Sequence, residues 1–288
     1  MLNLILIRGG GDLASGVALR LHHAGFDVLI TELPQPLAVR RAVSFSEAVY
    51  EGRWTVENVT SRLIQTPEQL ADCLARREIP ILIDPDLSLI ATFNPSIRLR
   101  HSEQAFRPLA IVDARLLKQV APPLTHSSPF TIGLGPGFTV GENCHAIIET
   151  QRGHTLGRVY WSGSANPDSG QPEGDPRRVL RAPADGLLTG YAQIGEHCEP
   201  GQVIAEVNGE KIVAPFSGVL RGLLHPGLEV SKGLKVGDLD PRDKREYCFL
   251  VSDKALAIGG GVLEAILGYQ TSPQAAVSGV RYQAREQG

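Results

Sequence analysis

The sequence predicts an α/β protein in which a parallel sheet is followed by a second, all-β domain. Two observations carry this prediction: a strand, glycine turn, helix and strand near the N-terminus, and an internal repeat in the second half of the chain. A length of 288 residues fits one or two domains, and 42% hydrophobic residues suffice for a folded core. The net charge of −3 argues against nucleic acid as the main partner.

The first unit begins with Leu4–Ile7, a short apolar run typical of a buried parallel strand, and Gly9–Gly11 follow it. Residues 13–24 repeat apolar side chains at helical spacing, and residues 26–30 form a second apolar run. A strand, turn, helix and strand within about thirty residues predict the βαβ unit of a Rossmann-like domain. We place this domain at residues 1–160.

The glycine turn is the predicted site for a phosphate-bearing cofactor. Its spacing, Gly9-x-Gly11-x-x-Ala14, lets backbone N–H groups approach a phosphate at a helix N-terminus. Glu32 follows the second strand, where dinucleotide-binding folds place a ribose-binding acid. Asp12 counts against a pyrophosphate because like charges repel, and the glycines would equally serve the tight turn alone. The predicted cofactor-binding residues are Gly9, Gly10, Gly11, Asp12, Leu13, Glu32, Arg41, Gly135 and Gly137.

Three further apolar runs, at residues 79–83, 109–112 and 130–134, extend the predicted sheet. Asp84 and Asp113 end the first two runs, either facing a ligand crevice or capping a turn.

The segment that follows these strands gathers side chains capable of chemistry. Its candidate catalytic residues are Cys144, His145, Glu149, Arg152 and His154. A cysteine is a soft donor that can take selenium or bind molybdenum, and a neighbouring histidine can lower its pKa. The spacing matches no closed zinc site, so we predict no metal site, and each residue taken singly equally fits a structural role.

Two segments of the second domain superpose at a constant offset of 32 residues, as in Ala182 with Ala214 and Gly186 with Gly218. Such a repeat predicts two copies of one β-rich unit that share a core, and Asn208-Gly209 predicts a type I′ hairpin turn. The pattern resembles the barrel-sandwich hybrid of biotinyl and lipoyl carrier domains, over residues 178–242. Lys211 lacks the preceding Met of those domains, so we expect neither biotin nor lipoate there.

A C-terminal helix is predicted over residues 250–270, although it contains Gly259, Gly260 and Gly261. Each glycine costs a helix about 1 kcal/mol relative to alanine. Either close packing on the first domain offsets this cost, or Gly261 begins a helix N-terminus that offers amides to an anion.

Location is predicted from what the sequence lacks. No apolar run approaches the roughly 18 residues of a membrane span, and the first residues lack the basic start of a signal peptide. The four cysteines form no CxxC pair. We therefore expect a cytoplasmic protein with free thiols and no membrane partner.

Five segments along nearly the whole chain resemble the YqeB-type accessory proteins of selenium-dependent molybdenum hydroxylases. They are RGGGDLASG at 8–16, VSFSEAV at 43–49, GLGPGF at 133–138, RGHTLGR at 152–158 and IGGGVLEA at 258–265. The resemblance implies a role in maturing xanthine or purine dehydrogenase-like enzymes, which would be client partners of this chain. It carries no catalytic assignment.

Three functions remain open on the sequence. The first is a maturation factor that binds a nucleotide or a molybdopterin-type cofactor at the glycine turn. The second is an NAD(P)-dependent oxidoreductase, although the chain shows no convincing Tyr-x-x-x-Lys pair. The third is a non-catalytic assembly scaffold, so whether the protein is an enzyme is left open.

Overall fold

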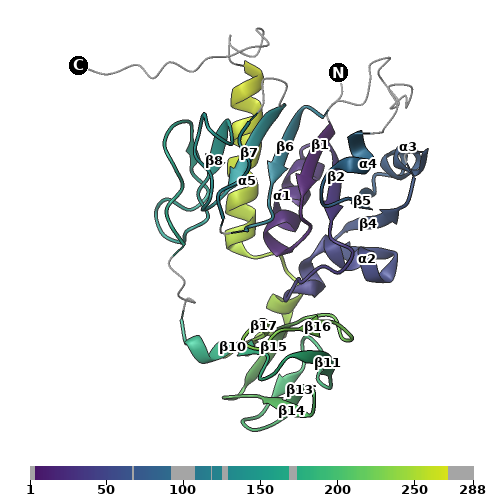
Figure 1. Ribbon diagram of the computed structural model, residues 1–288, viewed down its shortest axis with the longest axis vertical. Helices are drawn as coiled ribbons and strands as arrows, with labels where there is room; N and C mark the ends of the chain where they lie inside the picture. Colours follow the sequence, from purple (N-terminus) through teal and green to yellow (C-terminus); the bar gives the residue numbers. More distant parts are fainter. Residues whose placement is uncertain are drawn as a thin grey trace.

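The computed structural model describes residues 4–66, 68–91, 108–117, 119–124, 129–168 and 174–271. These residues form a large mixed sheet with helices, called here the mixed-sheet unit, and a smaller unit built from antiparallel strands, called the antiparallel unit (Figure 1).

The mixed-sheet unit contains one nine-stranded sheet of order β3-β4-β5-β2-β1-β6-β7-β8-β9. Its strands are β1 (Leu4–Arg8), β2 (Asp27–Glu32), β3 (Arg53–Val56), β4 (Val59–Ile64), β5 (Ile79–Ile83), β6 (Ala110–Asp113), β7 (Phe130–Leu134), β8 (Ala146–Ile148) and β9 (Val159–Tyr160). Strands from β4 across to β8 pair in parallel, whereas β3 and β9 pair antiparallel at the two edges.

Helices cover both faces of this sheet. They are α1 (Asp12–His23), α2 (Ala48–Glu51), α3 (Glu68–Ala75), α4 (Ser88–Ala91) and α5 (Asp253–Thr271), with the 3₁₀ helices η1 (Arg41–Val43) and η2 (Phe45–Glu47) before α2. Because side chains alternate along a strand, Ile5 and Ile7 pack toward α1 and α5, while Leu4 and Leu6 pack toward α3.

The antiparallel unit contains two four-stranded sheets, of order β10-β17-β15-β12 and β14-β13-β11-β16. Its strands are β10 (Val179–Arg181), β11 (Gly186–Gly190), β12 (His197–Cys198), β13 (Val203–Val207), β14 (Glu210–Val213), β15 (Gly218–Leu223), β16 (Glu229–Val230) and β17 (Lys235–Asp240). The 3₁₀ helices η3 (Pro176–Arg178) and η4 (Arg245–Cys248) flank it.

The internal repeat is visible in this pairing. Strands β11, β12 and β13 of the first copy correspond to β15, β16 and β17 of the second, and each copy lends its short middle strand to the other copy's sheet. Asn208 and Gly209 have φ angles of 52° and 81°, which confirms the predicted type I′ turn between β13 and β14.

The predicted fold class, a Rossmann-like parallel sheet joined to a barrel-sandwich hybrid, is wrong. The large sheet is mixed, because the β3–β4 hairpin and the returning strand β9 add antiparallel edges. Residues 179–240 form two separate four-stranded antiparallel sheets and are not clearly a barrel-sandwich hybrid. The apolar runs identified individual buried strands, but they contained no information on the direction of the half-exposed edge strands.

Helices α1 and α5 pack at backbone distance. A Cβ atom on Gly16 would lie 2.6 Å from Cβ of Ala255, and one on Gly259 would lie 2.8 Å from the carbonyl oxygen of Gly16. Gly261 lies against the loop before β9. A Cβ atom added to Gly261 would lie 2.2 Å from the carbonyl oxygen of Gly157. The helix thus packs closely at Gly259 and Gly261, two of the three glycines that would otherwise destabilise it.

Two arginines join the units. Nη2 of Arg40 donates to the carbonyl oxygens of Tyr247 (3.3 Å) and Leu250 (3.1 Å), and Nε of Arg41 donates to the carbonyl of Leu223 (3.1 Å). The backbones of the two units also lie close together at this contact, since a Cβ atom added to Gly222 would lie 2.7 Å from the carbonyl oxygen of Val39. The segment between β2 and α2 therefore holds the antiparallel unit in place.

Candidate functional site

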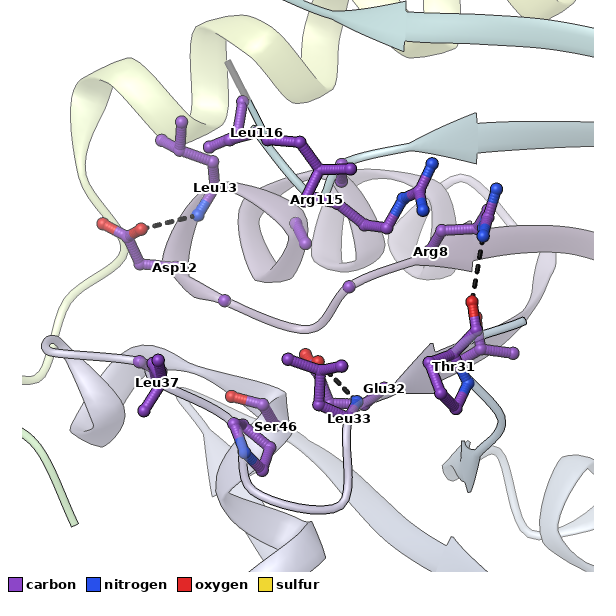
Figure 2. Close-up of a pocket in the computed structure, with 18 of the residues that line it drawn as sticks. Arg8, Asp12, Leu13, Thr31, Glu32, Leu33, Leu37, Ser46, Arg115 and Leu116 are labelled. Atoms are coloured by element: carbon purple, nitrogen blue, oxygen red, sulfur yellow. Dashed lines mark hydrogen bonds between the residues drawn. The ribbon is translucent and has the colours of Figure 1, made fainter. Parts of the chain in front are cut away.

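A cavity of about 470 Å³ lies over the turn between β1 and α1. Its polar lining includes Arg8, Glu32, Ser46 and Arg115, and its apolar lining includes Leu33, Pro36, Leu37, Leu116 and Leu117. Figure 2 shows Arg8 and Arg115 on one side of the glycine turn and Glu32 and Ser46 on the other. Arg8, Glu32 and Arg115 lie at or just after the carboxyl ends of β1, β2 and β6, whereas Ser46 lies in η2. The parallel strands and the segment after β2 therefore build the site together.

The glycine turn is fixed by backbone contacts on both sides. Gly9 has a φ of 91°, a conformation that favours glycine. The N–H of Gly10 donates to Oε2 of Glu32 (2.6 Å), and the carbonyl of Gly10 accepts from the N–H of Ser46 (2.9 Å). Gly11 has a φ of −66°, and a Cβ there would meet nothing within 4 Å. Gly11 is therefore the glycine that leaves open space at the cavity.

Glu32 is oriented by two backbone donors. Besides the N–H of Gly10, the N–H of Leu33 donates to its Oε1 (2.8 Å). Burial raises the pKa of this carboxyl group, while the two hydrogen bonds act to lower it. A carboxylate has about four acceptor positions, so two remain for hydroxyl or amino groups of a ligand.

Arg8 and Arg115 share one carboxylate, that of Asp113. Arg115 donates to both of its oxygens, with Nε at 2.9 Å and Nη2 at 2.6 Å, whereas Nη1 of Arg8 lies 3.7 Å away. Arg8 also donates from Nη2 to the carbonyl of Pro85 (2.9 Å). Burial, and then the positive charge of Arg115, lowers the pKa of Arg8. An anion bound beside the two guanidinium groups would relieve this repulsion.

Two buried polar atoms at the cavity lack partners among the described residues. They are Nε of Arg8 and the hydroxyl oxygen of Ser46, which is fully buried. A buried polar group without a hydrogen bond costs about 1–3 kcal/mol, so such atoms are rare in folded proteins.

Asp12 does not present an uncompensated charge to the turn. Its Oδ1 accepts from the N–H of Leu13 (3.0 Å), and its Oδ2 lies 3.5 Å from Nη1 of Arg40. Asp86 also lines the cavity, so the lining has a cationic side at Arg8 and Arg115 and acidic groups elsewhere. A ligand that combines an anionic group with hydroxyl or amino groups matches this distribution.

Five of the nine predicted cofactor-binding residues line the cavity: Gly9, Gly11, Asp12, Leu13 and Glu32. Gly10 supports it through its bond to Glu32. Arg41, Gly135 and Gly137 lie outside the lining. Arg41 binds Glu47, while Gly135 and Gly137 leave room for Oγ1 of Thr150 and the carbonyl oxygen of Gln119.

Sequence reasoning missed Arg8, Ser46 and Arg115 as site residues. The available signal was a basic residue at the end of each of two buried strands, Arg8 before the glycines and Arg115 after Asp113.

The two acids at strand ends have local partners. Asp84 accepts from the N–H groups of Leu89 (3.1 Å) and Ile90 (2.9 Å) at the start of α4, and Asp113 holds Arg115.

The candidate catalytic residues of the 144–154 segment do not line the cavity. Cys144 is buried in an apolar cluster with Phe138 and Ile147, and Nδ1 of His145 accepts from the N–H of Thr131 (2.9 Å). Burial lowers the pKa of His145.

Two of the other three candidates, Glu149 and Arg152, have hydrogen-bond partners. Glu149, fully buried, accepts from the N–H groups of Gln151 (2.7 Å) and Asn166 (3.0 Å). Arg152 donates twice to Asp253, at 2.8 and 3.2 Å, and His154 is exposed. The catalytic role of these five residues stays a prediction. The contacts give Cys144, His145, Glu149 and Arg152 structural roles.

The reactivity of Cys144 is a direct test of that role. Burial raises the pKa of its thiol to about 12 and that of Cys73 to about 11, so neither is a thiolate at pH 8. We expect iodoacetamide at pH 8 to leave both unmodified in the folded protein and to modify both in urea, as measured by mass spectrometry of digests. Rapid labelling of Cys144 alone in the folded protein would instead mark it as a reactive thiol.

No protein-family model matches the chain. It is 45% identical over 268 residues to a protein of Escherichia coli (strain K12) that carries the name "Uncharacterized protein YqeB". The match covers 92% of this chain and 47% of YqeB, so the chain spans about half the length of this curated relative. The match supports the resemblance to YqeB-type proteins and assigns no activity.

Similar solved structures include an aspartoacylase family protein from Mesorhizobium loti, with 12% identity and a TM-score of 0.26 over 82% of this chain and 84% of that chain. The ectoine utilization protein EutE from Ruegeria pomeroyi has 12% identity and a TM-score of 0.24, over 82% and 85% of the two chains. A succinylglutamate desuccinylase/aspartoacylase from Rhodobacter sphaeroides has 15% identity and a TM-score of 0.25, over 82% and 84%. Likeness at this level assigns neither an activity nor a ligand to this chain.

Within the described part of the chain, every helix is too short or too polar to cross a lipid bilayer.

Proposed function

We propose that this chain, similar to YqeB over 92% of its length, is an accessory factor in the maturation of selenium-dependent molybdenum hydroxylases. Its cavity binds a nucleotide or a pterin nucleotide in this proposal. The client is a xanthine or purine dehydrogenase-like enzyme, and both proteins share the cytoplasm. All four cysteines of the chain are free and buried, which suits a reducing compartment.

The observation that carries the ligand class is the distribution of polar groups around the cavity. Arg8 and Arg115 are suited to a phosphate, because guanidinium groups bind phosphate oxygens with paired hydrogen bonds. Glu32 has acceptor positions for the hydroxyl groups of a sugar or the amino groups of a pterin.

The apolar lining supports a ring system in the ligand. Leu33 and Leu37, at the cavity, are 46% and 48% exposed, which is high for leucine. A flat base or pterin lying against them would remove this apolar surface from water. A phosphate at the arginines and a ring at the leucines together describe a nucleotide-like molecule.

Calorimetric titration tests the ligand. We expect CTP or molybdopterin to bind the purified protein, with affinity that falls as salt rises because charge attracts the phosphate. Binding of NAD or NADP alone would favour the oxidoreductase alternative, in which Glu32 accepts from the ribose. If none of the four molecules binds, a nucleotide site at this cavity is wrong.

Activation of the client tests the maturation role. In a strain that lacks the gene, we expect selenium-dependent molybdenum hydroxylase activity to be lost and to return with the wild-type gene. A variant with a blocked cavity, Gly11→Val, separates two mechanisms. If it fails to restore activity, the ligand is required, whereas full restoration would indicate a scaffold. Normal hydroxylase activity in the deletion strain would overturn the proposal.

A further inference from the structure

A histidine and two glutamates meet where the mixed-sheet unit contacts the antiparallel unit. Glu47 ends η2, Glu51 ends α2, and His225 follows β15. One potential ligand atom from each side chain lies within 4.8 Å of the other two. In Figure 1, α2 lies at the end of the mixed-sheet unit that faces the antiparallel unit. The three side chains therefore come from both units and converge on one point.

The ring of His225 is held with one nitrogen facing the glutamates. Its Nδ1 lies 2.9 Å from the carbonyl oxygen of Pro226, which can only accept, so Nδ1 carries the proton. The other ring nitrogen, Nε2, lies 3.8 Å from Oε1 of Glu51. Metal-binding histidines commonly donate their other ring N–H to a backbone carbonyl in this way.

An aromatic ring supports that orientation. Tyr50 stacks on His225 with ring centroids 4.1 Å apart and planes 15° apart, and its hydroxyl donates to the carbonyl of Pro36 (2.8 Å). Since Pro36 lines the cavity and Ser46 directly precedes Glu47, the cluster lies next to the cavity wall.

The two carboxylates of the cluster differ in burial and in their partners. Glu47 is buried and accepts from Nη1 of Arg41 (3.0 Å) through Oε1, which leaves its second oxygen for an ion. The Glu51 side chain is 50% exposed and the His225 side chain 27% exposed. Two carboxylates and one imidazole thus meet beside one guanidinium, and water can reach the cluster to complete a coordination shell.

We propose that Glu47, Glu51 and His225 bind one divalent transition-metal ion of the Zn²⁺ or Mn²⁺ class. One imidazole and two carboxylate ligands suit these ions better than Mg²⁺, which prefers oxygen ligands alone. Three protein ligands with remaining positions open to water resemble a catalytic site more than a closed structural one. A bound ion would also tie the antiparallel unit to the cavity wall. This site is independent of the proposed nucleotide and of the maturation role.

Titration of the purified full chain with ZnCl₂ tests the site. The variants are Glu51→Gln and His225→Gln, because both side chains are partly exposed and their replacement leaves the ion pair between Arg41 and the buried Glu47 intact. His197→Gln is the matched control. His197 also contacts two carboxylates, Asp243 at 2.8 Å and Glu199 at 3.1 Å, but through opposite ring nitrogens, so they cannot share one ion with it.

We expect one strong Zn²⁺ site per chain in the wild type and in His197→Gln. Each of Glu51→Gln and His225→Gln should weaken it by at least about 10-fold, the lower end of the loss for outer-shell partners of metals. The electron paramagnetic resonance spectrum of added Mn²⁺ should show bound ion in the wild type and free ion in both variants. Circular dichroism melts confirm that the variants fold. Wild-type affinity in either variant, or no strong site in the wild type, would overturn the proposal.

Discussion

Replacing Gly11 by valine is expected to abolish ligand binding at the cavity while the protein remains folded. The φ of −66° at Gly11 is open to any residue, and a Cβ there meets nothing within 4 Å. The branched side chain would then occupy cavity space that the glycine leaves open and that the proposed ligand needs. We expect the affinity for whichever nucleotide the wild type binds to fall more than about 100-fold, or about 2.7 kcal/mol.

The fold should tolerate this change. Gly11 is the N-cap residue of α1, and valine is a poor N-cap, so a loss of about 1 kcal/mol of stability is expected. Gly260→Val is a suitable control because Gly260 also has nothing within 4 Å but lies in α5, outside the cavity. Calorimetric titration measures binding and thermal melts measure folding. A folded Gly11→Val protein with wild-type affinity would place the ligand elsewhere.

The buried elements of the mixed-sheet unit were predictable because they are local in the sequence. The runs at 79–83 and 130–134 match β5 and β7, and the helical spacing from Leu13 matches α1. Burial on both faces makes such strands continuously apolar, and a helix shows its apolar period without knowledge of its neighbours. These signals identify elements one at a time.

The edges of the sheet were not predictable in the same way. Strand β3 is half-exposed, and its hairpin turn is Glu57-Asn58, with Glu57 at a φ of 54° where a glycine would have marked the turn. The direction of an edge strand depends on the partner it pairs with, which no local pattern specifies. The fold class was therefore wrong although many of its strands were correctly located.

The same distinction between local and long-range information applies to the residues of the candidate site. Gly9, Gly11 and Glu32 were predictable because they stand at a recognisable spacing around one turn. Arg115 and Ser46 reach the cavity from distant segments, and only the pairing of β6 with β1 and the contact of Ser46 with Gly10 bring them there. The glycine-rich sequence predicted ligand-binding residues at Gly135 and Gly137, but these glycines instead allow the chain to pack closely.

The glycines of α5 give the second large expected effect, because adjacent positions should respond to the same substitution with opposite sign. Gly260 is exposed with nothing within 4 Å, so Gly260→Ala should gain about 0.8–1 kcal/mol from the better helix propensity of alanine. Gly261 is buried, and its Cβ would lie 2.2 Å from the carbonyl oxygen of Gly157 and 2.9 Å from Cγ2 of Ile148. Both neighbours would have to move.

Gly157 cannot yield easily, since its N–H donates to the carbonyl of Glu149 (2.9 Å), and the N–H of Glu149 donates in turn to the carbonyl of Arg158 (3.0 Å). Overpacking against such a loop typically costs about 1–3 kcal/mol, which exceeds the propensity gain of alanine, so Gly261→Ala should destabilise the protein. Urea unfolding followed by circular dichroism would measure both variants against the wild type. If Gly261→Ala stabilises the protein as much as Gly260→Ala does, then α5 does not approach the 157 loop at backbone distance, and the glycines must have another cause.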